Sequence, residues 1–193
     1  IGGALSMVEI LTVLYFKILN LNLKNPKDRF ILSKGHGFLG LLSTLYIKKI
    51  ISKKILNSFQ QNGSEIIAHP IMNPNFGIET SNGSLGQGLS YGVGLSIANK
   101  LKNKKNNTYI ILGDGECYEG SVWEAAITAT ENNLDNLYVF IDSNGHQNDG
   151  EIGKNMKFKD LVNKWKGFSW NVKKINGHNH TEILNSLKNT KKD

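Results

Sequence analysis

The order of strands and helices along this chain predicts an α/β fold, a parallel β-sheet flanked by helices. Two strongly β-forming runs, 108–112 and 137–141, are separated by a helical pattern at 119–132. Strand, helix and strand in this order form a βαβ unit with parallel strands. A short strand is also expected at 29–32, and alternation of this kind is typical of α/β domains. The 193 residues, 39% hydrophobic and 20% charged, suit one globular domain.

The helices are predicted from apolar side chains that recur every three or four residues. The first contains Ser6 and Glu9, three positions apart as in a capping box. The step from Asn25 to Pro26 closes this first unit, because a residue before proline avoids the helical conformation. A further strand is expected at 170–175. The helices are expected at residues 3–19, 38–50, 53–59, 85–101, 119–132, 158–165 and 181–187.

The stretch 85–101 is rich in glycine, and each interior glycine costs a helix about 1 kcal/mol relative to alanine. Such a helix is favoured where its backbone packs closely against a neighbour, so we expect it to be buried. Residues 62–84 before it form a long irregular stretch. Loops of that length are uncommon in compact domains and are often functional.

Composition narrows the classes of partner. The net charge of +7 is compatible with nucleic acid. Arg29, however, is the only arginine among 23 basic residues, so a lysine-biased surface is the preferred interpretation. No apolar run is long enough to span a membrane. The single cysteine, Cys117, excludes a disulfide framework and favours the cytoplasm. The chain opens without methionine, so we expect one domain, 1–193, truncated at both ends.

Polar residues follow two of the expected strands. Gly113, Asp114 and Gly115 come after one strand, and Asn144 follows the next. Parallel strands end at one edge of a sheet, where ligands bind, so Asp114 and Asn144 can be neighbours. Their oxygens suit Mg²⁺ or Ca²⁺, and Mg²⁺ completes a partial protein shell with water and phosphate. The glycines allow a diphosphate to approach the backbone.

These turns also have other interpretations. Glycine and aspartate are common in plain βα turns, but the placement of Asn144 favours a site. Residues 35–40 match the G-x-G-x-x-G pattern of dinucleotide-binding folds. The acidic residue that this pattern requires about twenty positions later is absent, so we do not favour a dinucleotide site.

The motifs together resemble the transketolase family, over essentially the whole chain. Gly113, Asp114 and Gly115, followed at a distance by Asn144, resemble the thiamine-diphosphate signature. The further matching segments are 33–37 (SKGHG), 69–70 (HP), 83–88 (GSLGQG), 113–116 (GDGE), 119–125 (EGSVWEA), 164–170 and 176–178 (NGH).

The resemblance implies roles for residues of this sequence. Asp114 and Asn144 would bind Mg²⁺ through their side chains, and His146 through its backbone carbonyl. His36 and His69 would face the thiazolium ring and the substrate as donors and proton carriers, a task that suits histidine. Glu119 would lie in a carboxylate network at a subunit interface. The remaining residues implied to contact the cofactor are Gly83, Ser84, Leu85, Gly113, Gly115 and Glu116.

The resemblance also implies an activity and partners. The reaction would be transfer of a two-carbon ketol unit from a ketose phosphate to an aldose phosphate, with thiamine diphosphate and Mg²⁺ (or Ca²⁺). The family's pyrimidine-binding domain is absent, so the chain would be an N-terminal subunit, inactive without a pyrimidine-binding C-terminal partner. Two such pairs would form a dimer of heterodimers. The alternatives are another thiamine-diphosphate enzyme subunit, deoxyxylulose-phosphate synthase-like or sugar-modifying, and a cofactor-free relic.

Several other polar or aromatic residues are expected to be structural. His178 and His180 lie at a helix start without an evident partner. Trp123 and Trp165 follow helical spacing and are expected in the core. Nothing around Cys117 marks it as a nucleophile.

Overall fold

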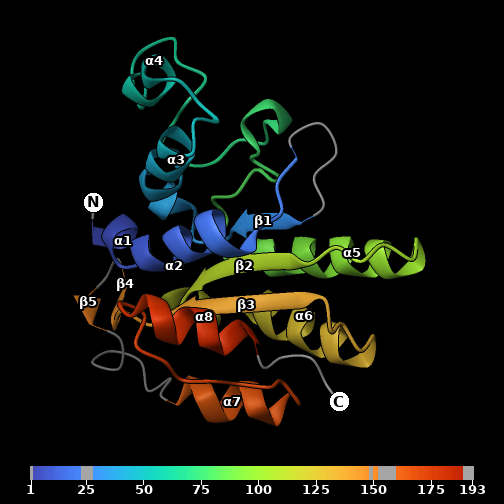
Figure 1. Ribbon diagram of the computed structural model, residues 1–193. Helices are drawn as coiled ribbons and strands as arrows, with labels where there is room; N and C mark the ends of the chain where they lie inside the picture. The colour runs from blue at the N-terminus through green and yellow to red at the C-terminus, as the bar shows by residue number, and fades with distance from the viewer. Residues whose placement is uncertain (1, 23–27, 148–149, 152–159, 189–193) are drawn as a thin grey trace.

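A computed structural model describes residues 2–22, 28–147, 150–151 and 160–188. Its centre is a parallel sheet of three strands in the order β1-β2-β3, formed by β1 (Arg29–Leu32), β2 (Thr108–Gly113) and β3 (Leu137–Asp142). Helices flank this sheet on both faces (Figure 1). The predicted α/β fold with a parallel sheet is therefore confirmed.

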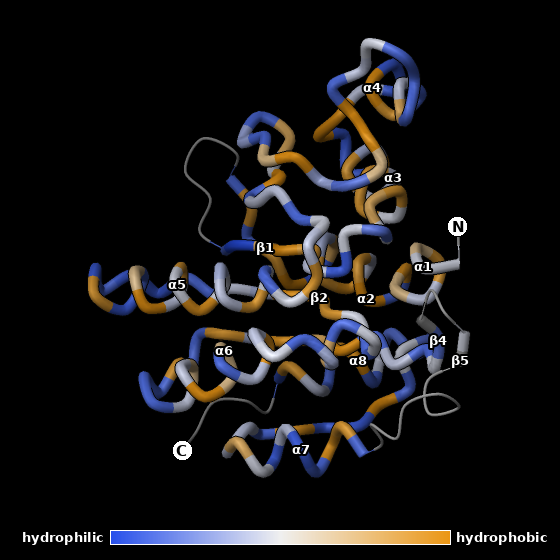
Figure 2. Tube along the Cα trace, turned by 180° about the vertical axis from the view of Figure 1, so that it is seen from behind, coloured by the Kyte–Doolittle hydropathy of each residue, from blue (hydrophilic) through white to orange (hydrophobic). Residues whose placement is uncertain are grey.

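The helices form two layers around the sheet. In Figure 2, α5 and α6 lie together in front of the strands, whereas α2 and α8 lie behind them. A short antiparallel pair, β4 (His146–Gln147) and β5 (Gly150–Glu151), follows β3. The α-helices are α1 (Gly2–Leu5), α2 (Val8–Val13), α3 (Phe38–Ile47), α4 (Lys53–Asn57), α5 (Gln87–Leu101), α6 (Gly120–Glu131), α7 (Leu161–Gly167) and α8 (His180–Lys188).

Alternation along the strands divides the core into two parts. Tyr109 and Ile111 of β2 pack with α2, α3 and Ile183 of α8. Ile110 and Leu112 point to the opposite face and pack with α5, α6 and Trp165 of α7. Successive side chains of a strand face opposite sides, so a strand buried on both faces is apolar throughout. The continuous apolar run of β2 follows from this position in the middle of the sheet.

The first predicted helix is interrupted. α1 ends before Ser6, α2 begins at Val8, and a π-helix, Leu14–Ile18, continues it. The capping-box prediction is wrong, because Met7 occupies the N-cap position and no side chain caps α2. The Ser6 hydroxyl instead donates to Asp142 Oδ2 at 2.5 Å. A long-range polar partner thus replaces the local cap.

The strand predicted at 170–175 is also wrong, because these residues form no strand in the structure. Trp170 packs edge-on against Trp165, and its indole N–H donates to the Ala126 carbonyl at 3.1 Å. Its side chain is therefore partly buried against helices rather than in the sheet. The predicted helix start at 158 and the step from Asn25 to Pro26 lie outside the described residues.

Helix α5 is buried on one face only. A Cβ at Gly88 would lie 2.3 Å from Ser33 Oγ, and one at Gly92 would lie 2.2 Å from Ile110 Cδ1. These two glycines let the helix backbone approach the sheet, as predicted from its composition. Gly94, in contrast, has no neighbour within 4 Å of such a Cβ. Within the described ranges, none of the helices has both the length and the apolar character needed to cross a membrane.

Candidate functional site

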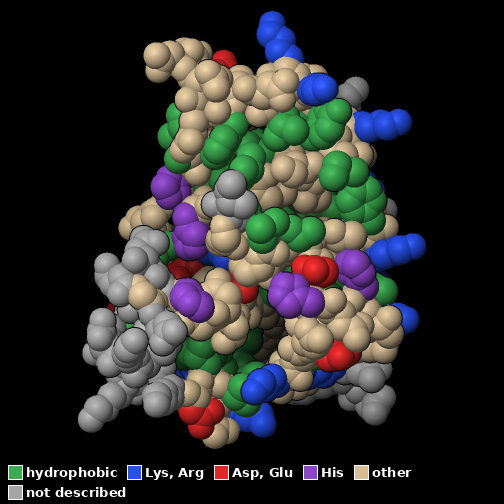
Figure 3. Space-filling view, turned by 90° about the vertical axis from the view of Figure 1, so that its left-hand side faces the viewer, with side chains coloured by type: hydrophobic (Ala, Val, Ile, Leu, Met, Phe, Trp, Pro, Cys, Tyr) green, Lys and Arg blue, Asp and Glu red, His purple; other side chains and the backbone are tan. Residues whose placement is uncertain are grey.

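The two glycine-containing turns leave the sheet at the same edge. Gly113 of β2 pairs in register with Asp142 of β3, and both strands end there. The Asp114 N–H then donates to the Asp142 carbonyl at 3.3 Å, which extends the pairing into the turns. Figure 3 faces this edge and shows histidine side chains gathered across the middle of the surface. The carboxyl edge of the sheet therefore collects the polar residues singled out in the sequence.

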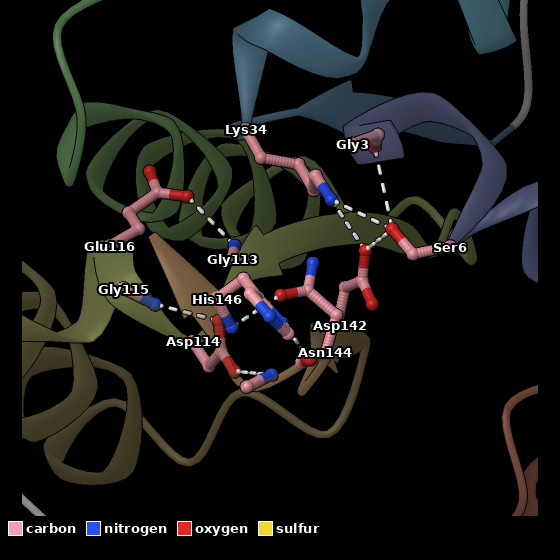
Figure 4. Close-up of polar contacts among 11 residues, drawn as sticks. Gly3, Ser6, Lys34, Gly113, Asp114, Gly115, Glu116, Asp142, Asn144 and His146 are labelled. Carbon is pink, nitrogen blue, oxygen red and sulfur yellow. Dashed lines mark hydrogen bonds and ion pairs between the residues drawn. The ribbon is translucent and has the colours of Figure 1, made fainter. Parts of the chain in front are cut away.

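Asp114 joins the two turns. Its side chain accepts from the Gly115 N–H through Oδ1 at 2.9 Å and from the Gly145 N–H through Oδ2 at 2.8 Å. Burial raises the pKa of this carboxyl group, and the nearby Asp142 carboxylate adds to the effect, although the two N–H donors oppose it. Figure 4 shows Asp114 directed toward the turn that carries Asn144 and His146. The predicted proximity of these turns is present.

The second turn is exposed and organised by its own bonds. Asn144 Oδ1 accepts from the His146 N–H at 2.9 Å, and His146 Nδ1 lies 3.0 Å from the Asn144 carbonyl oxygen. Both side chains are open to solvent. The amide oxygen of Asn144 thus stays at the sheet edge beside Asp114, as seen in Figure 4.

The donor set fits a hard divalent cation. A carboxylate has about four acceptor positions, so Asp114 keeps free lone pairs beyond its two N–H partners. Asn144 and the His146 carbonyl add further oxygens. Among the residues that the structure describes, no three His, Cys, Asp or Glu side chains form a cage that could hold a metal alone. A partial oxygen shell completed by phosphate and water is the arrangement that Mg²⁺ favours.

Glu116 lies inside the protein and is only 2% exposed. Its Oε1 accepts from the Ser33 hydroxyl at 2.5 Å and from the Gly86 N–H at 2.7 Å, and its Oε2 accepts from the Gly113 N–H at 3.1 Å. Burial raises the pKa of this carboxyl group in spite of these donors. Glu116 thereby ties together the end of β1, the start of α5 and the end of β2. Its predicted contact with a cofactor stays a prediction.

His36 and His69 lie against glycines. A Cβ at Gly3 would lie 2.8 Å from His36 Cδ2, and one at Gly35 would lie 3.0 Å from His69 Cδ2. A Cβ at Gly83 would lie 3.6 Å from the same His69 atom. The turn after β1 and the loop before α5 therefore meet around the His69 ring, whereas the His36 ring lies against α1. The absence of side chains at these glycines makes room for both.

The charge state of His36 is set by its surroundings. Burial lowers its pKa, and the positive charges of Lys34 and His69 lower it further, whereas Asp142 opposes them. The lowered pKa favours the neutral form of His36, in which one ring nitrogen can accept a proton and the other can donate a hydrogen bond.

The loop that leads into α5 lies on the same side of the protein. Gly83 and Ser84 are exposed and Leu85 is partly exposed. Gly86 has φ +83°, and a Cβ there would lie 2.7 Å from the Glu119 Cβ. Glu119 itself is exposed. The predicted contacts of Gly83, Ser84 and Leu85 with a cofactor, and of Glu119 with another subunit, stay predictions.

The glycines of the G-x-G-x-x-G pattern have a packing explanation. A Cβ at Gly37 would lie 2.5 Å from Met7 Cε, and one at Gly40 would lie 3.3 Å from the Ala4 carbonyl oxygen. They permit α1 to pack on the turn after β1. This agrees with our rejection of a dinucleotide site.

Sequence reasoning missed a buried polar cluster formed by Ser6, Lys34 and Asp142. The Lys34 ammonium group forms an ion pair with Asp142 Oδ2, and its Nζ lies 3.3 Å from the Ser6 hydroxyl (Figure 4). The sequence did contain one signal for this cluster, a lysine placed between an apolar strand and a glycine turn. Its partner is too distant in sequence to be recognised.

Three other predictions changed or gained detail. His178, for which no partner was expected, has its Nδ1 3.1 Å from Glu9 Oε2. Cys117 is buried, and burial together with the Glu116 charge raises its pKa to about 12, so its thiol is unreactive. Trp123 and Trp165 pack with ring centroids 5.3 Å apart, as expected for core residues. Arg29 pairs with Glu79 at 2.7 Å.

The parallel sheet, the glycine turns and the oxygen donors at its edge define an α/β protein of the thiamine-diphosphate-binding type. A family described as "Transketolase, thiamine diphosphate binding domain" matches residues 1–193. The chain therefore belongs to this transketolase family, whose domain binds thiamine diphosphate.

Relatives and solved structures agree with this membership. The chain is 38% identical to a 6-deoxy-6-sulfo-D-fructose transketolase subunit SqwG from Clostridium sp. (strain MSTE9), covering 100% of this chain and 71% of the relative. It is 38% identical to an apulose-4-phosphate transketolase subunit from Phocaeicola vulgatus, covering 97% and 68%. The transketolase structure from Campylobacter jejuni has a TM-score of 0.82 at 32% identity, covering 95% of this chain and 30% of that one. The chain thus spans about a third of the solved transketolase.

Proposed function

We propose that this chain is the diphosphate-binding subunit of a transketolase that transfers a two-carbon ketol unit from a ketose phosphate to an aldose phosphate. The observation that carries the proposal is the hydrogen bond between Asp114 and the Gly145 N–H, which joins two oxygen-bearing turns at one sheet edge. The matching family and the subunit names of the relatives support it.

The residues at this edge would divide the binding of the cofactor among them. Asp114, Asn144 and the His146 carbonyl would hold Mg²⁺ or Ca²⁺, and the Gly115 N–H would donate to the diphosphate. Thiamine diphosphate, when bound, supplies the electron sink for breaking and forming the carbon–carbon bond. The contribution of the protein is to fix the cofactor and its metal beside the histidines.

His36 and His69 would handle hydrogen bonds and protons of the sugar hydroxyl and carbonyl groups. The close approach of Gly3 to His36 and of Gly35 to His69 supports this proposal, because it limits where each ring can lie. The lowered pKa of His36 favours its neutral form, which can accept a proton. Gly83, Ser84 and Leu85 would line the same space.

A partner subunit would complete the active site. The residues proposed here would contact the diphosphate half of the cofactor, and a pyrimidine-binding partner chain would supply the other half of the contacts. We propose a dimer of heterodimers, with the exposed Glu119 at the interface, and no activity for this chain by itself. A single domain acting in the cytoplasm, without nucleic-acid or membrane partners, belongs to the same proposal.

The proposed substrates are sugars that carry an anionic group. The relatives are named for a sulfonated fructose and for apulose 4-phosphate, and both names include such a group. The net charge of +7 would attract substrates of this kind.

The test removes the carboxylate that joins the two turns. The full-length subunit, combined with its pyrimidine-binding partner, is assayed for Mg²⁺-dependent binding of thiamine diphosphate and for ketol transfer. We expect Asp114→Asn to weaken cofactor binding by about tenfold or more, because the metal shell loses its only protein carboxylate. Asp135→Asn is the control, since this side chain is 83% exposed and pairs with Lys100 at the other end of β3.

Equal activity and equal cofactor affinity in Asp114→Asn and in the wild type would contradict the proposal. A wild-type complex that binds no thiamine diphosphate at any Mg²⁺ concentration would instead identify a cofactor-free relic.

A further inference from the structure

The buried cluster of Ser6, Lys34 and Asp142 lies directly beside the proposed metal site and has no role in it so far. Lys34 follows β1 and is fully buried, and Asp142 ends β3 and is 6% exposed. One oxygen, Asp142 Oδ2, accepts hydrogen bonds from both the Lys34 ammonium group and the Ser6 hydroxyl. Figure 4 shows this cluster next to Asn144 and Asp114.

A buried ion pair is a poor way to gain stability. Taking two charges out of water costs several kcal/mol per ion, and apolar residues of similar size often stabilise a fold equally well. The position of this pair matters for that reason. Asp142 is two residues before Asn144, and its carbonyl accepts from the Asp114 N–H.

Two carboxylates, Asp114 and Asp142, therefore lie together at an edge that has to accept an anionic diphosphate. Without a counter-charge, the second carboxylate would repel the diphosphate and attract additional cations. Lys34 is the only lysine or arginine paired with either carboxylate among the described residues. Its ammonium group reaches the site from the turn that also carries His36.

We propose that Lys34 is a positioning and charge-compensating residue, which neutralises Asp142 so that the end of β3 adds no net negative charge beside Asp114, where the metal and the diphosphate would bind. Lys34 and Ser6 also fix the end of β3, from which the turn with Asn144 begins. This inference rests on the proposed function.

The test compares variants of Lys34 and Asp142, whose charges are opposite. In the full-length subunit with its partner, we measure the affinity for thiamine diphosphate at saturating Mg²⁺ and, separately, the affinity for Ca²⁺ without cofactor, both by calorimetry. Lys34→Met is expected to weaken thiamine diphosphate binding by about tenfold and to strengthen Ca²⁺ binding. Asp142→Asn is expected to weaken Ca²⁺ binding. It is expected to bind thiamine diphosphate at least as tightly as the wild type does.

A purely structural ion pair would give another pattern. Loss of either Lys34 or Asp142 would then weaken the binding of both thiamine diphosphate and Ca²⁺, because the turn would lose its position in both variants. That result, or unchanged affinities in both variants, would overturn the inference. If the wild type itself binds no thiamine diphosphate with Mg²⁺, the proposed function fails first, so the two failures are distinguishable.

Lys34→Met leaves a buried carboxylate without its partner and is the variant most exposed to misfolding. The double variant Lys34→Met/Asp142→Asn removes both charges, so it tests the inference even if Lys34→Met does not fold. Charge compensation predicts affinities within about twofold of the wild type for both ligands in this variant. A structural role predicts a loss at least as large as that of either single variant, which would overturn the inference.

Discussion

The two turns that form the proposed metal site differ in how the protein holds them. The turn after β2 contains Asp114 and Glu116, both buried, and its carboxylates accept from donors in several other segments. The turn after β3 contains Asn144 and His146, both exposed, and its side-chain bonds stay within the turn. The first turn is part of the core, whereas the second can change without disturbing the fold. Substitutions that remove side-chain contacts of the first turn should therefore lower the stability of the fold. Substitutions in the second turn should lower ligand affinity with little effect on stability.

The largest effect on folding is expected at Glu116. Glu116→Ala would leave three donors, the Ser33 hydroxyl and the N–H groups of Gly86 and Gly113, without their acceptor. We expect the free energy of unfolding to fall by about 3 to 5 kcal/mol, measured by urea denaturation of the full-length subunit. Glu124→Ala on the exposed side of α6 should stay within about 0.5 kcal/mol of the wild type. Equal losses in the two variants would remove the distinction between the core turn and the surface.

A smaller effect is expected where α5 approaches this core turn. A Cβ at Gly88 would lie 2.9 Å from the Ser33 Cα as well as against its side chain, so the backbone of the turn after β1 must shift. Gly88→Ala should lower the free energy of unfolding by about 1 to 3 kcal/mol.

Gly94→Ala on the same helix is the matched control, because the added Cβ meets nothing within 4 Å. It should raise the free energy of unfolding by about 0.4 to 1 kcal/mol, since alanine loses less backbone freedom on folding. Thermal unfolding with the same sign of shift in both variants would show that α5 does not pack on the turn as described.

A contrast between local patterns and contacts with distant residues also explains which features could be predicted from the sequence. The strands and α6 were predictable because their patterns are local, with an apolar run for each strand and helical spacing between them. The convergence of Asp114 with Asn144 was also predictable, since consecutive parallel strands joined by one helix end at one sheet edge. The proposed thiamine-diphosphate site followed from these two residues and the family resemblance.

Features that depend on distant partners were not predictable. Ser6 and Glu9 satisfy the local rule for a capping box, yet the Ser6 hydroxyl finds Asp142 instead, 136 positions away. Lys34 likewise depends on that same carboxylate. The segment that begins at Trp170 was expected to form a strand, but Trp170 packs against α6 and the segment lies outside the sheet. In each case tertiary packing decides between local alternatives of similar energy.

The smallest effect on folding is expected in the exposed turn, at Asn144. Asn144→Ala removes an acceptor for the His146 N–H, which solvent can replace, so the free energy of unfolding should stay within about 0.5 kcal/mol of the wild type. The affinity for thiamine diphosphate in the presence of Mg²⁺ should nevertheless fall about ten- to a hundredfold, because the metal loses an oxygen ligand. Ser143→Ala, one position earlier and also exposed, should change neither quantity. An unchanged cofactor affinity in a folded Asn144→Ala protein would show that the Asn144 side chain is not a metal ligand, and would leave Asp114 as the only side chain of the pair that binds the metal.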